Sequence, residues 1–146
     1  CSYLETVHLP ENLRSIPEYT FCHCLRLTEV NLPKDVTTVG KYAFYCCRKL
    51  SDVSMPESLT SIGEYAFAYC DEFKNVVVPN KVSNIGKEAF ANSKSLSSIK
   101  IPSSVKTIGE DIFKNCNALK TVFAEKGSRA DNWLADHPGK YIVSYS

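Results

Sequence analysis

The stretch LTEVNLPKDVTTVGKYAFYCCRK, residues 27–49, runs directly into LSDVSMPESLTSIGEYAFAYCDE, residues 50–72. Written one above the other, the two stretches share a leading leucine, a proline, a glycine, an Ala-Phe pair and a cysteine at the same places. The 23-residue step continues in both directions, and the prolines that mark it are Pro10, Pro33, Pro56, Pro79 and Pro102. A period this strict indicates repeated structural units, and it predicts five full units over residues 4–118.

Each unit carries eight apolar positions. In the second unit they are Leu27, Val30, Leu32, Val36, Val39, Ala43, Phe44 and Cys47. Over the five units only Thr20 and Ser93 place a plainly polar residue at one of these positions. One unit cannot bury its own apolar face, but units stacked on one another can. The sequence therefore predicts a solenoid in which each apolar side chain contacts its counterpart one layer away.

Local patterns within the unit predict its shape. Residues 27–32 are typical of a short strand that ends at a proline, and residues 36–39 of a second short strand that ends at a glycine. Strands of the same kind from successive units would lie parallel, about 4.8 Å apart. We expect residues 41–44 to form one tight helical turn. The position just before the repeated cysteine should have a positive φ, because Asn92 and Asn115 occupy it in two units.

The repeat pattern ends after Val122. Ser128 is placed to cap a short helix that runs to Asp136, and residues 141–143 read as a final strand. The helix should present one apolar face made of Ala130, Trp133 and Leu134. We therefore divide the chain into a repeat array, residues 1–123, and a helical C-terminal cap, residues 124–146. No cap is expected at the other end, since the first residues are already in register with the repeat. We expect the natural protein to extend further there, and this uncapped N-terminal repeat is a candidate for self-association.

The pattern LxxVxLPxxVxxVGxxAFxxCxx of residues 27–49 and 50–72 resembles the BspA-like, treponemal-type leucine-rich repeat family. The likeness covers residues 1–123, and its departures are Pro17 for glycine, Thr20 for alanine, Ser93 for cysteine and Ile112 for alanine. The resemblance implies a leucine-rich-repeat solenoid. It also implies a secreted or surface-displayed protein of a host-associated bacterium or protist parasite, with a role in adhesion to host matrix or cell-surface proteins.

Composition and motifs argue against several other classes of protein. Seventeen Lys and Arg residues nearly balance sixteen Asp and Glu residues, and no basic stripe for nucleic acid is present. No apolar run approaches the roughly 18 residues that a membrane helix needs. The three histidines, His8, His23 and His137, fall in different contexts, and no phosphate loop or H-E-x-x-H motif occurs. We therefore expect no enzymatic activity, no cofactor, no nucleic-acid partner and no membrane insertion.

Five of the seven cysteines share one position of the repeat, and Ser93 completes their row. They are Cys1, Cys24, Cys47, Cys70 and Cys116. This row predicts a buried structural ladder of free thiols, because stacked equivalents hold their Cβ atoms near the layer spacing, beyond the usual disulfide range of about 3.5–4.5 Å. Cys22 and Cys46 lie outside the row, and a bridge between them stays open. The spacing of the cysteines around His23 does not match that of a zinc site.

Binding residues are expected on the outward side of the first strand of each unit, the predicted concave face. The two outward rows are Thr6, Glu29, Asp52, Asn75, Ser98 and Thr121, and His8, Asn31, Ser54, Val77, Lys100 and Phe123. A second candidate patch consists of Tyr19, Tyr42 and Tyr65, which suit either an interface or packing along the array. The predicted function is a protein-binding adhesion scaffold. The alternative is a structural spacer in a longer array whose binding activity lies elsewhere.

Overall fold

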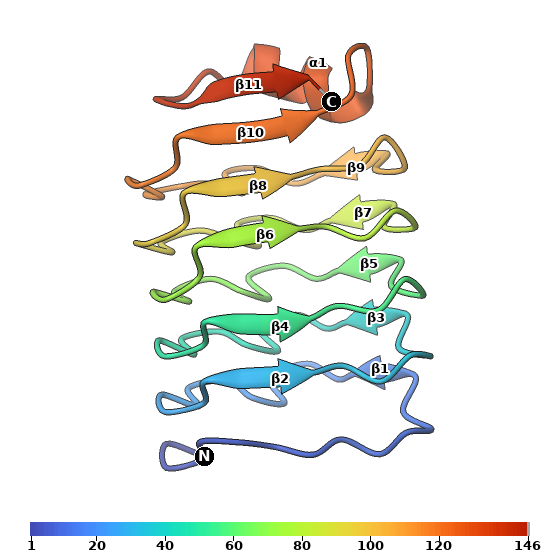
Figure 1. Cartoon of the computed structure of the whole chain (residues 1–146), viewed down its shortest axis with the longest axis vertical. Helices are drawn as coiled ribbons and strands as arrows, with labels where there is room; N and C mark the ends of the chain where they lie inside the picture. The colour runs from blue at the N-terminus through green and yellow to red at the C-terminus, as the bar shows by residue number, and fades with distance from the viewer. Residues whose placement is uncertain (146) are drawn as a thin grey trace.

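The computed structural model describes residues 1–145 and winds the chain into a stack of turns with a 23-residue repeat (Figure 1). The turns carry a two-residue strand on one side, here the rear ladder, and from the second turn onward a longer strand on the opposite side, here the front sheet. All strands pair in parallel. The predicted solenoid of parallel strands is therefore confirmed.

The strands follow the chain in alternation between the two sides. The front sheet contains β2 (Glu29–Asn31), β4 (Asp52–Ser54), β6 (Asn75–Val77), β8 (Ser98–Lys100), β10 (Thr121–Ala124) and β11 (Ile142–Tyr145). The rear ladder contains β1 (Ser15–Ile16), β3 (Thr38–Val39), β5 (Ser61–Ile62), β7 (Asn84–Ile85) and β9 (Thr107–Ile108). Both strands of the unit were expected, and the structure forms each over fewer residues than the apolar pattern covered.

The rear ladder runs unbroken through five strands in the order β1-β3-β5-β7-β9. Glycines beside it allow successive turns to approach closely. A Cβ atom added at Gly63 would lie 2.7 Å from the backbone carbon of Gly40, and one at Gly109 would lie 2.3 Å from the backbone nitrogen of Lys87. No side chain fits at these distances, so the repeated glycine is required by the contact between layers rather than by its φ.

A column of phenylalanine rings fills the core beside the rear ladder. The rings of Phe44 and Phe67 stack at 5.2 Å between centroids with 5° between their planes, and Phe67 and Phe90 stack at 5.7 Å. At the C-terminal end of the column, the rings of Phe113 and Trp133 meet edge to face at 6.1 Å. Trp133 therefore covers the end of the column, as expected of an apolar residue in the C-terminal cap.

The segment after each repeated glycine is a series of tight turns and not the helical turn that we expected. The amide of Ala43 donates to the carbonyl of Gly40, and that of Cys47 to the carbonyl of Phe44. Tyr42 has φ 57° and Cys46 has φ 58°, which is incompatible with a right-handed helix and resembles the third residue of a type II turn. This part of the prediction is wrong because two residues of the segment adopt left-handed backbone conformations, which a right-handed helix does not accommodate.

Positive φ values recur at two positions of every unit. The predicted position holds His23, Cys46, Tyr69, Asn92 and Asn115, with φ between 57° and 60°. The unpredicted position holds Tyr19, Tyr42, Tyr65, Glu88 and Asp111, with φ between 49° and 60°. A non-glycine residue in this region carries a conformational cost. Hydrogen bonds to the following layer offset it: the amide of Tyr42 donates to the carbonyl of Glu64 at 2.9 Å, and that of Cys46 to the carbonyl of Ala68 at 3.0 Å.

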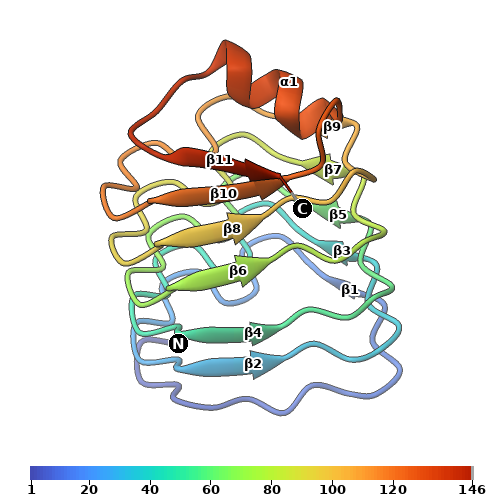
Figure 2. The ribbon, with the colours of Figure 1, turned by 45° about the horizontal axis from the view of Figure 1, so that its top comes forward.

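The C-terminal segment forms the predicted helix, α1 (Arg129–Asp136), which lies across the end of the stack (Figure 2). The Ser128 side chain accepts a hydrogen bond from the amide of Asp131 and caps the helix. Its buried residues are Ala130, Trp133 and Leu134, as predicted. After α1, β11 adds in parallel to β10 and completes the front sheet. Within the described residues, no helix has the length and apolar character needed to cross a bilayer.

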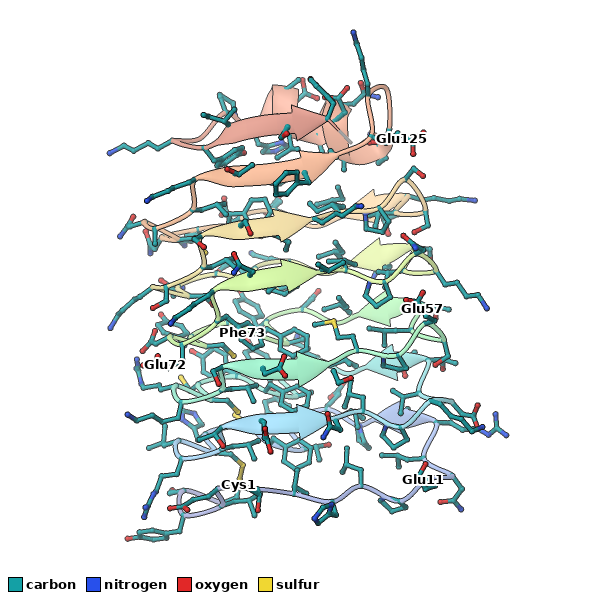
Figure 3. All side chains as sticks on the ribbon, in the orientation of Figure 1. Cys1, Glu11, Glu57, Glu72, Phe73 and Glu125 are labelled. Carbon is teal, nitrogen blue, oxygen red and sulfur yellow. A yellow bond between two sulfur atoms is a disulfide. The ribbon has the colours of Figure 1, made fainter. Side chains whose placement is uncertain are left out.

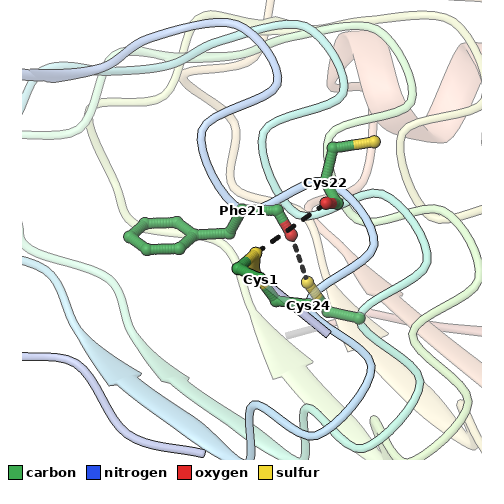
Figure 4. Close-up of a disulfide and its surroundings, with 5 residues drawn as sticks. Cys1, Phe21, Cys22 and Cys24 are labelled. Carbon is green, nitrogen blue, oxygen red and sulfur yellow. Dashed lines mark hydrogen bonds between the residues drawn. A yellow bond between two sulfur atoms is a disulfide. The ribbon is translucent and has the colours of Figure 1, made fainter. Parts of the chain in front are cut away.

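The cysteine row is buried from its second member onward, but the prediction of free thiols is wrong at its N-terminal end. Cys1 and Cys24 form a disulfide with a Cα–Cα distance of 5.0 Å, which lies within the range for such bridges (Figure 4). The prediction assumed that all side chains of the row point the same way. Cys1 is exposed, so its side chain is not held in the orientation of the buried members and can turn toward Cys24.

The other members of the row are free thiols that donate to a backbone carbonyl of the preceding layer. Cys47 donates to the carbonyl of Phe21 at 3.0 Å, and Cys116 donates to that of Phe90 at 3.0 Å. Ser93 donates in the same way with its hydroxyl. This shared bond explains why serine can replace cysteine in the row. Cys22 and Cys46, the pair left open, are also free.

Candidate binding face

The front sheet places the two outward rows as the alternation of its strands requires. Glu29 lies opposite Asp52, and Asn31 lies opposite Ser54, in the pairing of β2 with β4. Asn75, Ser98 and Thr121, and likewise Val77, Lys100 and Phe123, are in register along the pairing of β6, β8 and β10, whereas Thr6 and His8 precede the first front strand and lie in no strand. The exposed members are Thr6, His8, Glu29, Asn31, Asp52, Ser54, Asn75, Val77 and Lys100, while Ser98, Thr121 and Phe123 are half-buried. The structure therefore brings the predicted residues onto one face, and their role in binding stays a prediction.

Charge is distributed unevenly along this face. Glu29 and Asp52 lie side by side on paired strands, and within the described residues neither forms a salt bridge. Like charges directly opposite each other on a sheet are destabilising. By contrast, on the turn side of the repeat Asp71 is paired with Arg48 at 2.8 Å. The acidic pair of the front sheet therefore remains available to a positively charged partner.

The front sheet is broken in the middle, between β4 and β6. It consists of a two-stranded part, β2-β4, and a four-stranded part, β11-β10-β8-β6. Both views of the ribbon show the wider interval between β4 and β6 (Figures 1 and 2). We call this interval the seam. The sequence did not predict it, because the 23-residue period continues through it without an insertion or deletion.

Backbone hydrogen bonds define the seam. Elsewhere in the sheet the amide of Ser51 donates to the carbonyl of Thr28, and that of Ser97 to the carbonyl of Lys74. Within residues 1–145 the equivalent bond from Lys74 to Ser51 is absent, and so is the bond from Met55 to Val77. On the rear side of the same two layers, β5 and β7 remain paired. The two layers are thus joined at the back and open at the front.

Phe73 explains why the sheet opens here. It occupies the leading position of the repeat, where the adjacent layers have Leu50 and Leu96. Its ring is only 3% exposed and packs against Phe67 at 5.7 Å between centroids. A larger ring inserted into a close-packed column forces the neighbouring backbone to move. Figure 3 shows Phe73 at the level between β4 and β6.

Side chains at the seam are less buried than their equivalents in other layers. Val53 and Met55 are half-buried, whereas Val30 is 2% exposed and Leu32 is 6% exposed. A hollow of about 230 Å³ opens there. Its lining residues are Ser51, Asp52, Val53, Met55, Phe73, Asn75, Val76 and Val77. The seam is therefore a recess lined by both polar and apolar side chains, and Phe73 in a leucine column was the one signal of it in the sequence.

A second hollow of about 470 Å³ lies beside the front sheet at its N-terminal end and contains Thr6, His8, Glu29 and Asn31 in its lining. Four of the predicted residues therefore share one recess. Among residues 1–145 no three His, Cys, Asp or Glu side chains gather closely enough to hold a metal ion.

The tyrosine patch lies on the turn side, away from the front sheet. The rings of Tyr19 and Tyr42 stack at 5.1 Å, and those of Tyr42 and Tyr65 at 4.8 Å. Tyr45 meets Tyr42 edge to face, and burial raises the pKa of its hydroxyl, which stays protonated at neutral pH. The stacked rings cover one another's faces, so a partner would meet their edges and hydroxyls. Tyr19, at 54% exposed, is the most accessible ring of the stack.

Comparison with solved structures identifies leucine-rich repeat proteins. One from Bacteroides ovatus is 30% identical with a TM-score of 0.80, over 85% of this chain and 32% of that protein. The T. pallidum leucine-rich repeat protein is 32% identical with a TM-score of 0.77, over 79% of this chain and 56% of that one. This chain thus spans about a third and just over half of these two proteins.

A leucine-rich cell surface protein from Faecalibacterium prausnitzii is 26% identical with a TM-score of 0.52, over 77% of this chain and 43% of that protein. No protein among the curated sequences is similar enough to count as a match. The model of the BspA type leucine rich repeat region matches six copies over residues 1–120. This family is a non-enzymatic type of repeat scaffold associated with protein interaction. With this match over most of its length, the chain belongs to the BspA-type leucine-rich repeat family.

Proposed function

We propose that this chain is the binding part of a secreted or surface-displayed adhesion scaffold, which attaches to a host or neighbouring-cell protein through the outward rows of the front sheet. The observation that carries the proposal is the pair Glu29 and Asp52: two exposed carboxylates in register, without a cationic partner among the described residues, on a hydrogen-bonded sheet. Exposed residues on a rigid repeat scaffold are where such proteins bind.

The location outside the cell is supported by likeness and not by a feature of the chain itself. The relative from Faecalibacterium prausnitzii is described as a cell surface protein. Since the chain spans 32% and 56% of the leucine-rich repeat proteins from Bacteroides ovatus and T. pallidum, the partners of the whole protein are part of the proposal.

The test is direct binding to a panel of purified extracellular-matrix and cell-surface proteins. We expect the triple variant Glu29→Ala, Asp52→Ala and Asn75→Ala to lose at least about tenfold in affinity, because charged groups at an interface contribute strongly to binding. A control variant with Glu57→Ala, Glu110→Ala and Asn117→Ala removes the same charges elsewhere on the surface. Equal binding by both variants would exclude the front sheet as the binding face.

A spacer in a longer array is the alternative, and the N-terminal layer favours it. Leu4, Val7, Leu9 and Leu13 are only partly buried there, although they pack against the core. Further repeats or a second copy of the chain would cover them. Sedimentation of the purified chain tests for self-association through this layer. Any such association should weaken when Leu9 is replaced by Lys. A chain that stays monomeric and binds no protein of the panel would favour the spacer.

A further inference from the structure

The seam exposes backbone groups that strands normally satisfy. On one side the carbonyl of Ser51 and the amide of Met55 point toward the seam in the pattern of the repeat, and on the other side the amide of Lys74 and the carbonyl of Val77 do so. Donors and acceptors of this kind, presented by the edges of two strands, are matched by a polypeptide in extended conformation. A small molecule or a sugar offers no such series of alternating amides and carbonyls.

The apolar side chains that line part of the recess limit which side chains such a polypeptide can carry. Val53, Met55, Phe73 and Val77 are among its lining residues, and Val77 has 68% of its surface exposed. A hollow of about 230 Å³ has room for one or two aliphatic side chains and not for a larger apolar surface. Because alternate residues of a strand point to opposite sides, the residues directed into the recess would be apolar at every second position.

Charged residues beside the recess determine which outward-facing side chains of the bound segment are favoured. Asp52 lines the recess and lies beside Glu29, and neither carboxylate is neutralised by a salt bridge within residues 1–145. On the β6 side, Lys74 precedes the strand and Lys100 lies opposite Val77. A basic residue of the bound segment is therefore favoured on the β4 side, where the two carboxylates stand.

From these three features, and resting on the proposed function, we propose that the seam between β4 and β6 is the docking site for an extended segment of the partner protein. The segment alternates aliphatic and basic residues, pairs its backbone with the open strand edges, and places its aliphatic side chains in the recess over Phe73. The seam gives this binding face a preference for one sequence type, which the polar rows alone would not provide.

Hydrogen exchange tests the seam without any ligand. We expect the amides of Met55 and Lys74 to exchange at least about tenfold faster than the equivalent amides of Leu32 and Ser51, because they lack a partner strand. In the variant Phe73→Leu, which restores the residue of the neighbouring layers, both amides should become protected. Protection of these amides in the unaltered chain would overturn the proposal.

Peptide binding tests the occupant. The probe is a blocked eight-residue peptide of alternating Val and Lys, measured by calorimetry. We expect Phe73→Leu to weaken its binding at least about tenfold, as closing the seam removes the strand edges. The double variant Glu29→Gln and Asp52→Asn should weaken it about as much, with a smaller dependence on salt. A peptide with Glu in place of Lys, and one with N-methylated alternate amides, should bind at least about tenfold more weakly than the probe.

The variants separate this proposal from the broader one. Circular dichroism and thermal unfolding first show that Phe73→Leu is folded, which we expect because leucine fills this position in the neighbouring layers. If the probe binds the unaltered chain and Phe73→Leu equally, the seam is not the docking site. Loss of protein binding in the triple alanine variant but not in Phe73→Leu would keep the front sheet as the binding face and overturn the seam alone.

Discussion

The rear ladder and the front sheet are built from the same repeat, yet only one of them is continuous. The rear strands have two residues each and pair without interruption from β1 to β9, whereas the longer front strands separate between β4 and β6. Beside the rear ladder, close glycines repeat in each of the four layers from Gly40 to Gly109, and phenylalanine rings stack from Phe21 to Phe90. Behind the front sheet, one ring interrupts a leucine column. Continuity of a strand ladder therefore depends more on uniform packing beneath it than on the length of its strands.

The largest expected effect comes from the core on the continuous side. Phe67 stacks on Phe44 and Phe90, so Phe67→Ala leaves a cavity in the middle of the column and should lower the free energy of unfolding by about 3–5 kcal/mol. Phe73→Leu, on the broken side, should change it by less than about 1.5 kcal/mol, because the leucine column accepts the smaller residue. Urea denaturation measures both. Equal losses would mean that the seam is packed as tightly as the rest of the core.

An intermediate effect should follow from creating a second break. Leu96→Phe places a ring between the layers of β6 and β8 and should lower the free energy of unfolding by about 1–3 kcal/mol. The amides of Ser97 and Val78, which now donate to the carbonyls of Lys74 and Lys100, should lose protection from hydrogen exchange. Leu96→Met serves as the control, since a flexible side chain of similar volume can fill the same space. Unchanged protection in Leu96→Phe would show that a ring in this column does not open the sheet.

The smallest expected effect concerns the reactivity of the buried cysteines, which tests whether the seam is confined to the front sheet or extends into the core. Cys70 is fully buried three residues before Phe73, and Cys47 occupies the same position one layer earlier. Burial raises the pKa of Cys47 to about 12 and that of Cys70 well above its ordinary value, so both thiols are protonated at pH 8. With iodoacetamide at pH 8 we expect modification of the half-buried Cys22 and of neither ladder thiol. Faster reaction at Cys70 than at Cys47 would mean that the opening reaches the core.

The buried thiols also predict how the free energy of unfolding changes with pH. The pKa of these thiols in the folded chain lies above the value of 9.0 that an unperturbed thiol has. Their full contribution to the free energy of unfolding is therefore present below pH 9. It is lost as the pH rises from 9 toward about 12 for Cys47 and about 11 for Cys116, because the unfolded chain releases these protons first. In Cys47→Ser the fall should be shallower. A free energy of unfolding that does not decrease between pH 8.5 and pH 10.5 would contradict this.

Most of the fold was predictable from the 23-residue period. A repeat with so few polar residues at its apolar positions can bury them only by stacking on its neighbours. The capping residue Ser128 and the apolar spacing after it predicted the helix, and the two asparagines Asn92 and Asn115 predicted the positive φ at their position. The second left-handed position escaped notice because Tyr42 and its tyrosine equivalents give no hint of it, and Asp111 alone was a weak one. The Cys1–Cys24 bridge depended on side-chain rotation, which a rule based on Cβ spacing does not include.

The binding face was predictable only as far as exposure. Alternation along a strand determines that Glu29 and Asp52 point outward, and the structure agrees. The substitution of Phe73 into the leucine column was too weak a signal to predict the seam, because Phe73 is an ordinary apolar residue at an apolar position. Phe73 opens the sheet because its ring is larger than the leucines at the same position in the adjacent layers. The sequence of one repeat alone does not show this difference.

The left-handed bends also bear on how such an array changes its length over evolution. Inside the stack, tyrosine and cysteine hold these bends because the next turn accepts their amides. In the last repeat, among residues 1–145, no backbone carbonyl accepts from Asp111 or Asn115, and these are residue types that enter the bend most readily by themselves. We therefore expect interior units to be exchangeable as whole repeats, and the final unit to keep residue types that form the left-handed bend without a following layer.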